Sequence, residues 1–184
     1  MTATSKAPLF FQQRFWPMWT ALALGAFADN MLRQALIIGV SFGAIKAAGF
    51  SDPDSAVPII GALFAVAMLV FSSVAGQVAE KYETAMLFRR IKLAEIILMT
   101  IAGIGFLINS GWLLIVTMFA MGAQSAFFSP VRVGAMPKYL AMDELVRGNA
   151  LCNLGLFGAI LSGYAIGGFL IVEENGRAAV AAVL

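Results

Sequence analysis

Histidine is absent from this sequence, cysteine occurs once and charged residues are scarce. Without histidine and with a single cysteine, Cys152, the chain has no disulfide framework, no Cys/His zinc spacing and no nucleophile activated by histidine. Cys152 lies in an apolar stretch and is interpreted as a packing residue. We therefore expect no catalytic residue, no bound metal and no cofactor, and hence no enzyme.

Charged residues make up a small fraction of the sequence. Only 12% of the 184 residues are charged and 61% are hydrophobic, whereas about a quarter of the residues in a soluble domain are charged. The net charge is +2, and the densest basic cluster is "RRIK" at 89–92, which gives little support for a nucleic-acid partner. The composition instead predicts a protein whose solvent is the bilayer and whose neighbours are membrane lipids.

Several apolar segments are long enough to cross that bilayer. A spanning helix needs about 20 mostly apolar residues, because the hydrocarbon core is about 30 Å thick and each residue rises about 1.5 Å. The segments that qualify are 15–48, 57–79, 91–108, 112–128 and 149–172. A sixth segment, 178–184, is too short to cross and predicts an incomplete sixth helix. We expect an all-α bundle over 15–184, preceded by a cytoplasmic segment, 1–14.

The start of the first apolar segment also fits a cleavable signal peptide. Lys6 and Arg14 precede it, and "AFA" at 26–28 resembles a cleavage site. The apolar sequence continues far past "AFA", however, and further spans follow. A first transmembrane helix explains the same residues without a cleavage event.

Basic residues concentrate in alternate connections, which is typical of the positive-inside rule. One set of connections holds Lys6, Arg14, Lys81, Arg89, Arg90, Lys92, Arg132, Lys138 and Arg147. The other set holds Lys46 and Arg177, together with the acidic residues Asp52, Asp54, Glu173 and Glu174. This asymmetry predicts that the first set and the N-terminus are cytoplasmic.

Polar side chains interrupt the first apolar segment in "GAFADNMLRQAL" at 25–36. Asp29 falls near mid-membrane, where a charge costs roughly 2.5 to 3.5 kcal/mol and usually faces a bundle interior or a water-filled cavity. Arg33 follows one helical turn later, so the two charges can pair and fix helix packing. Asn30 and Gln34 in the same turn favour a second interpretation, a substrate or coupling-ion site.

Charges near the end of the second segment suggest a gate. In "GQVAEKY" at 76–82, Gly76 precedes Glu80 and Lys81, and Arg89 and Arg90 follow soon after. We predict that Glu80 forms an ion-pair cluster with these basic residues and holds helices together in one state. Positive-inside flanking explains the same charges without any gating.

Further polar residues lie in the fourth and fifth segments. Pro130 is expected to end or kink its helix, because it lacks an N–H and restricts the preceding residue. Gln124 and Ser125 offer polar groups inside the bundle, and Arg132 either meets a phosphate or lipid head group or snorkels to the interface. Asn149 and Asn153 form a second polar pair on one helix face.

Small residues recur at every fourth position of the fifth segment. Ala159, Gly163 and Gly167 lie along one face of the expected helix. Such spacing allows two membrane helices to approach closely, so we expect a packing surface there.

Four blocks of the sequence, in order, resemble a known family. They are "GAFADNMLRQAL", "GQVAEKY" with "RRIKLAEI", "QSAFFSPVRVGAMPKYL" and "ELVRGNALCNLGLFGAILSGYAIGG", and the resemblance extends over 15–169. They resemble the bacterial lysophospholipid transporter family of the major facilitator superfamily. They are also similar to the membrane domain that some bacteria fuse to acyltransferase and acyl-ACP synthetase domains.

The resemblance implies a fold. Such transporters have twelve helices in two halves, each built from inverted three-helix repeats around a shared cavity. This chain would be the six-helix N-terminal half, truncated in helix 6, and its partner would be the missing C-terminal half.

The resemblance also implies a function, the flipping of lysophosphatidylethanolamine and lysophosphatidylglycerol across the bacterial inner membrane by alternating access. Sodium or a proton is the possible coupling cation. Asp29 and Asn30 match the family's intramembrane Asp-Asn, and 76–80 matches its helix-2 gate. The family usually has Asp at the position of Glu80, so this chain departs from a strict gate motif. The alternatives are a transporter of another solute or drug, or the membrane domain of a fused acyltransferase.

Overall fold

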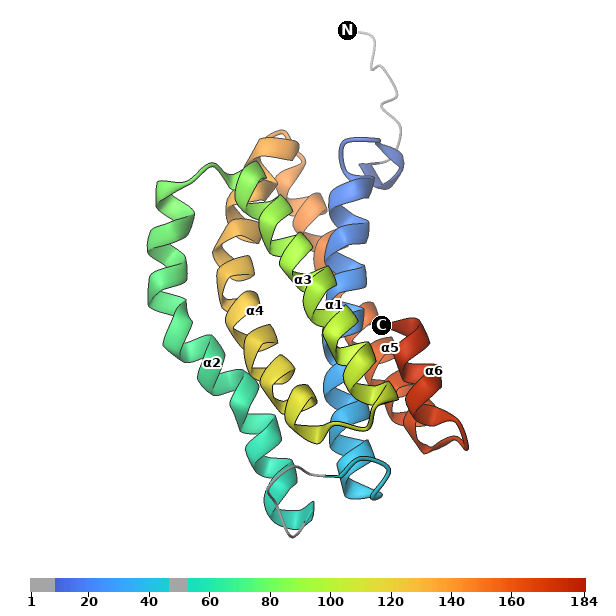
Figure 1. The fold of residues 1–184 in the computed structure, drawn as a ribbon. Coiled ribbons are helices and arrows are strands. Elements are labelled where there is room, and N and C mark those ends of the chain that lie inside the picture. Colours follow the sequence, from blue (N-terminus) through green and yellow to red (C-terminus); the bar gives the residue numbers. More distant parts are fainter. Residues whose placement is uncertain (1–8, 47–52) are drawn as a thin grey trace, which may run out of the picture.

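All the regular structure in the described part of the chain is helical. The computed structural model describes residues 9–46 and 53–184. A short 3-10 turn, η1 (Leu9–Phe11), precedes six α-helices that run alternately up and down the bundle (Figure 1). Their bounds are α1 (Trp16–Ser41), α2 (Pro53–Lys81), α3 (Thr84–Leu107), α4 (Gly111–Tyr139), α5 (Leu145–Val172) and α6 (Gly176–Val183).

Four of these helices, α1, α2, α4 and α5, are long and apolar enough to cross a membrane by length and composition. The helix α3 has 24 residues, but it includes the charged residues Arg89, Arg90, Lys92 and Glu95. The chain is therefore that of a multi-pass membrane protein.

The helices differ in their bounds from the apolar segments. The expected end of the first span, 48, lies outside the described residues, but α1 already ends at Ser41, and Gly43 then takes a φ of 73°. The helices α3, α4 and α5 instead extend beyond the predicted segments, so Arg89, Arg90 and Lys92 lie inside α3 rather than in a connection. Apolar content marks the part of a helix that sits in hydrocarbon, whereas backbone hydrogen bonding continues wherever the chain permits it.

Pro130 does not end its helix, contrary to one of the two outcomes that the sequence predicted. The helix α4 continues through Pro130 and Pro137 to Tyr139. A proline removes one backbone hydrogen bond, and neighbouring helices can hold the rest of a membrane helix in place. Val131 and Ala135, just beyond Pro130, are buried and supply that packing.

Two long helix pairs dominate the bundle: α1 packs along α5, and α2 packs along α4 (Figure 1). The expected close approach at Gly163 and Gly167 is present. A Cβ atom at Gly163 would lie 2.5 Å from the carbonyl oxygen of Phe27, and one at Gly167 would lie 2.5 Å from that of Met31. Backbone therefore meets backbone between α5 and α1, as small residues in membrane helices allow.

Ion pairing and hydrogen bonding tie helix ends together where α1 begins. Arg14 donates from Nη2 to both carboxylate oxygens of Glu144 at 2.7 Å. Lys138 Nζ donates to Thr84 Oγ1 at 2.8 Å, which connects the end of α4 with the start of α3. The connections that the sequence predicted to share one side do lie at this same end of the bundle (Figure 1). Lys6 lies outside the described residues.

Candidate functional site

A chain of polar side chains crosses the interior of the bundle from α3 through α4 to α1. Glu95 accepts hydrogen bonds from Lys92 Nζ at 2.8 and 3.0 Å and from Gln124 Nε2 at 2.9 Å. The neighbouring Ser125 Oγ donates to Asp29 Oδ2 over a long 3.4 Å. We call these five residues, Asp29, Lys92, Glu95, Gln124 and Ser125, the polar cluster.

Two members of the polar cluster are buried, so their charge and hydrogen bonds affect the stability of the fold. Glu95 and Gln124 are each only 8% exposed. A buried ion pair is tolerated when further hydrogen bonds satisfy its remaining atoms, and Gln124 supplies one to the Glu95 carboxylate. The buried Oδ1 of Asp29, in contrast, has no hydrogen-bond partner within the described part of the chain. A carboxylate oxygen in that situation can accept a cation or a donor group from a ligand.

Asp29 and Arg33 do not form an ion pair with each other, which contradicts the first of the two interpretations of this turn, the internal pair. The ion pairs in residues 9–46 and 53–184 are Arg14 with Glu144 and Lys92 with Glu95. Asp29 points to Ser125 on α4, whereas the Arg33 guanidinium lies 4.0 Å from the centre of the Phe64 ring on α2. A cation over an aromatic face is stabilised by the ring quadrupole. Spacing on one helix permits pairing, but neighbouring helices decide where each side chain points.

Arg33 lies among partners from two other helices. Its Nη1 donates to the hydroxyl of Tyr164 on α5 at 3.4 Å, and its buried Nε has no hydrogen-bond partner among the residues that the structure describes. A guanidinium with an unused donor is suited to a phosphate or carboxylate group.

The two amides beside Asp29 and Arg33 lie outside the polar cluster's hydrogen-bond chain. Asn30 is buried and donates from Nδ2 to the carbonyl of Ala26 on its own helix at 2.7 Å. Gln34 is half-buried and lies against Gly168 of α5. The expected turn of four polar residues is thus divided among different neighbours.

Two other predicted site residues share a separate pocket. Arg132 on α4 and Asn149 on α5 line a pocket of about 400 Å³, together with Met136, Pro137 and Leu145. Asn153, one turn further along α5, is half-buried. The pocket combines a cationic group, an amide and apolar walls.

The predicted gate cluster does not form in this structure. Glu80 takes part in neither ion pair of the described residues. Glu80, Lys81, Arg89 and Arg90 are all exposed, and Lys81 Nζ lies 5.8 Å from the centre of the Tyr82 ring. Exposed charges can remain solvated without a partner, because a surface ion pair gains only about 0 to 1 kcal/mol. Among the described residues, nothing beyond the local helix lies within 4 Å of a Cβ placed on Gly76, so that position is open.

Sequence reasoning missed two members of the polar cluster, Lys92 and Glu95, whereas Ser125 was expected to offer a polar group inside the bundle. Lys92 had been assigned to a cytoplasmic connection, and Glu95 had no assigned role. One signal was available, since Lys92 and Glu95 stand three residues apart and therefore on one helix face. That spacing indicates an internal pair once the helix is known to begin well before them.

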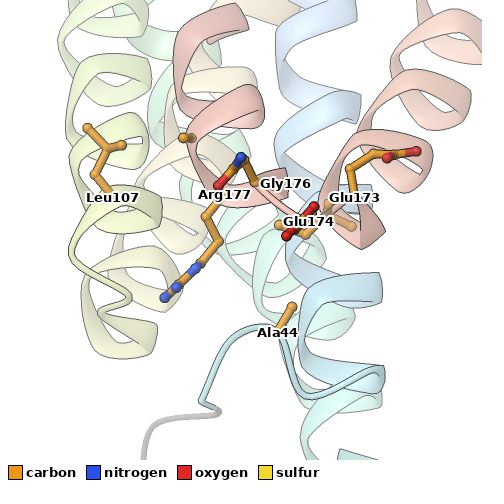
Figure 2. Close-up of a pocket in the computed structure, with 9 residues that line it drawn as sticks. Ala44, Leu107, Glu173, Glu174, Gly176 and Arg177 are labelled. Atoms are coloured by element: carbon orange, nitrogen blue, oxygen red, sulfur yellow. The ribbon is translucent and has the colours of Figure 1, made fainter.

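Another pocket lies at the opposite end of the bundle, beside the turn between α5 and α6. It measures about 310 Å³ and is lined by Ala44, Leu107, Glu173, Glu174 and Arg177, among others. Figure 2 shows the Arg177 side chain extending away from Glu173 and Glu174. None of the predicted site residues lines this pocket.

Comparison with known proteins identifies lysophospholipid transporters as relatives of this chain. The chain is 30% identical to the lysophospholipid transporter LplT of Photorhabdus laumondii over 148 residues, which is 79% of this chain and 33% of that protein. It is 31% identical to LplT of Salmonella typhimurium over 152 residues, covering 80% of this chain and 34% of that protein. No family model and no solved structure matches the chain.

These similarities establish homology to the bacterial LplT transporters over about 80% of the chain. The chain spans about a third of the length of the curated relatives that it matches.

Proposed function

We propose that this chain is the N-terminal part of a transporter that flips lysophospholipids, such as lysophosphatidylethanolamine and lysophosphatidylglycerol, across the bacterial inner membrane by alternating access. The homology to LplT transporters supports the substrate class. The observation that carries the proposal is the polar cluster, which lies among apolar helices with Glu95 and Gln124 buried and its other members half-buried. It ends at an Asp29 oxygen that has no hydrogen-bond partner among the described residues. Charged groups inside a membrane bundle generally mark a pathway for substrate or ions.

We further propose an architecture for the whole transporter. Residues 15–184 form a six-helix half made of two inverted three-helix repeats, and a second six-helix half supplies the other wall of the cavity. Residues 1–14 and the basic end of the bundle face the cytoplasm, as the positive-inside rule favours.

Within this transporter, Asp29 binds the coupling cation, sodium or a proton, and Arg33 binds the substrate phosphate. The Nε of Arg33, which has no hydrogen-bond partner within residues 9–46 and 53–184, supports its role. Asn30 and Gln34 are the neutral neighbours of this pair. Gln124 orients the cluster.

A second set of residues handles the head group and the gate. Arg132, with Asn149 and Asn153 nearby, receives the head group at the basic end. The gate forms ion pairs in another state of the transport cycle, since its exposed charges border the two-residue turn between α2 and α3. Its residues are Gly76, Glu80, Lys81, Arg89 and Arg90.

Uptake by spheroplasts tests the proposed function. Cells that lack their own lysophospholipid transporter would express the intact gene product and receive labelled lysophosphatidylethanolamine. We expect saturable uptake of the labelled lipid, and we expect unlabelled lysophosphatidylglycerol to reduce that uptake by competition. Competition by an unrelated drug but not by either lysophospholipid would contradict the proposal and favour a transporter of another solute.

Replacing Arg33 with glutamine should weaken substrate binding. Hydrogen bonds to charged groups contribute about 1.5 to 3 kcal/mol, so the KM for lysophospholipid should rise about tenfold or more. Arg177→Gln is the matched control, because Arg177 is exposed beside the turn between α5 and α6 and should leave KM unchanged. An unchanged KM in Arg33→Gln would remove Arg33 from the substrate site.

A further inference from the structure

The charges of the polar cluster do not cancel. Lys92 is cationic and pairs with the anionic Glu95. Asp29 adds a second carboxylate, which receives a hydrogen bond from the neutral Ser125. The nearby Arg33 is turned toward Phe64 and Tyr164 instead. With both carboxylates ionised, the cluster has one negative charge in excess, and a single monovalent cation would neutralise it.

Lys92 lies close to the excess carboxylate. A Cβ atom at Gly25 would collide with both Lys92 Nζ and Glu95 Oε1, so the ion pair packs directly against the α1 backbone at Gly25. Gly25 and Asp29 are four residues apart on that helix, and Cβ positions at this spacing are about 5 to 6 Å apart. The flexible Lys92 side chain can therefore reach Asp29 by a change of rotamer.

Lys92 is nevertheless held elsewhere. Its Nζ donates to both oxygens of Glu95 at 2.8 and 3.0 Å and lies 4.4 Å from the centre of the Phe128 ring. Gln124 Nε2 also donates to this carboxylate, at 2.9 Å from Oε2, and so helps to fix its orientation. Glu95 thus holds the one amine that could otherwise neutralise Asp29 from within the polar cluster.

We propose that Glu95 is a positioning residue that keeps Lys92 away from Asp29, so that Asp29 remains available to a monovalent cation from solution. This inference rests on the proposed function, in which Asp29 couples transport to a cation. An amine on a neighbouring helix competes with dissolved cations at a high effective concentration. Pairing that amine with Glu95 removes the competitor, and the cation requirement of transport depends on that pairing.

Two variants separate this role from simple support of the fold. Glu95→Gln preserves side-chain size but releases Lys92 to pair with Asp29. The double variant Glu95→Gln with Lys92→Met removes the released amine as well. Replacing a buried ion pair by neutral groups of similar size is generally tolerated, so the double variant is expected to fold.

The experiment measures lysophosphatidylethanolamine uptake by spheroplasts that express the intact gene product. Sodium is titrated against N-methylglucamine, and a protonophore in parallel samples distinguishes sodium from proton coupling. In Glu95→Gln, the half-maximal cation concentration should rise about tenfold or uptake should lose its cation dependence. The double variant should recover wild-type dependence, as should the conservative Glu95→Asp. Glu144→Gln, which breaks the ion pair with Arg14 at the bundle end, should behave as the wild type.

A second readout does not require transport. A cation that binds only the folded protein raises its Tm, so we expect titration of sodium, or of pH under proton coupling, to stabilise the purified wild type. This stabilisation should be lost in Glu95→Gln and return in the double variant.

Wild-type cation dependence in Glu95→Gln would overturn the inference, and so would a double variant that resembles the single one. A wild type that transports lysophospholipid with neither cation dependence nor a cation-dependent Tm would also overturn it, while leaving the substrate assignment intact. Absence of lysophospholipid uptake together with the expected pattern of Tm changes would contradict the proposed function but support the role of Glu95.

Discussion

Replacing Asp29 with asparagine is expected to lower cation-dependent lysophospholipid uptake by about tenfold or more, which is within the usual range of coupling between two ligands. Asparagine has the same shape, so its side-chain oxygen can still accept the hydrogen bond from Ser125. It lacks the negative charge that attracts a cation. The remaining uptake should respond little to sodium or to a protonophore.

The same variant should be at least as stable as the wild type. A carboxylate at mid-membrane costs roughly 2.5 to 3.5 kcal/mol on insertion scales, and a neutral amide avoids most of that cost. Lower uptake without a lower Tm in detergent would therefore separate a functional role from a structural one. Asp143→Asn, at an exposed position between α4 and α5, is the control for loss of one carboxylate. Wild-type uptake with wild-type cation dependence in Asp29→Asn would exclude Asp29 as the coupling site.

Replacing Gly163 with leucine is expected to abolish the folded bundle. The first added atom already meets the carbonyl oxygen of Phe27 and the backbone nitrogen of Met31, and backbone atoms cannot move aside as a side-chain end can. Overpacking usually costs about 1 to 3 kcal/mol, and a clash between two helix backbones lies at or above the upper end of that range. Loss of the monodisperse peak in size-exclusion chromatography in detergent would show the effect.

The same helix offers a matched control for this prediction. Gly158 is exposed, and in the part of the chain that the structure describes nothing beyond the local helix lies within 4 Å of a Cβ placed there. Gly158→Leu should therefore yield wild-type amounts of monodisperse protein. Equal behaviour of the two variants would mean that the contact between α1 and α5 does not depend on small residues.

The long apolar helices could be predicted because hydrocarbon imposes both composition and minimum length on a span. Their bounds could not, since Thr84 and Leu145 begin helices in sequence too polar to be counted as membrane-spanning. The packing surface at Gly163 and Gly167 was also predictable, because close approach of two backbones requires small side chains at helical spacing.

The hydrogen-bond and contact partners of the polar residues were harder to predict from the sequence than the helices were. Helical spacing indicates which residues of one helix share a face, but not which neighbouring helix lies opposite. The spacing thus allowed Arg33 to pair with Asp29, but Arg33 contacts Phe64 and Tyr164 on neighbouring helices instead. Gln124 was expected inside the bundle and is indeed buried, whereas its bond to Glu95 depends on how α3 packs against α4.

The two helix pairs have a mechanical consequence. The pair α1 and α5 is joined backbone to backbone at Gly163 and Gly167, and a Cβ at Gly122 of α4 would likewise collide with the Phe64 carbonyl oxygen of α2. Each pair is therefore stiff. Movement of one pair relative to the other concentrates at the seam, the boundary between the two pairs. The 3.4 Å contact from Ser125 on α4 to Asp29 on α1 crosses this seam and is long already. A shift of a fraction of an ångström is enough to break this hydrogen bond, so movement of one helix pair against the other changes the surroundings of Asp29 directly.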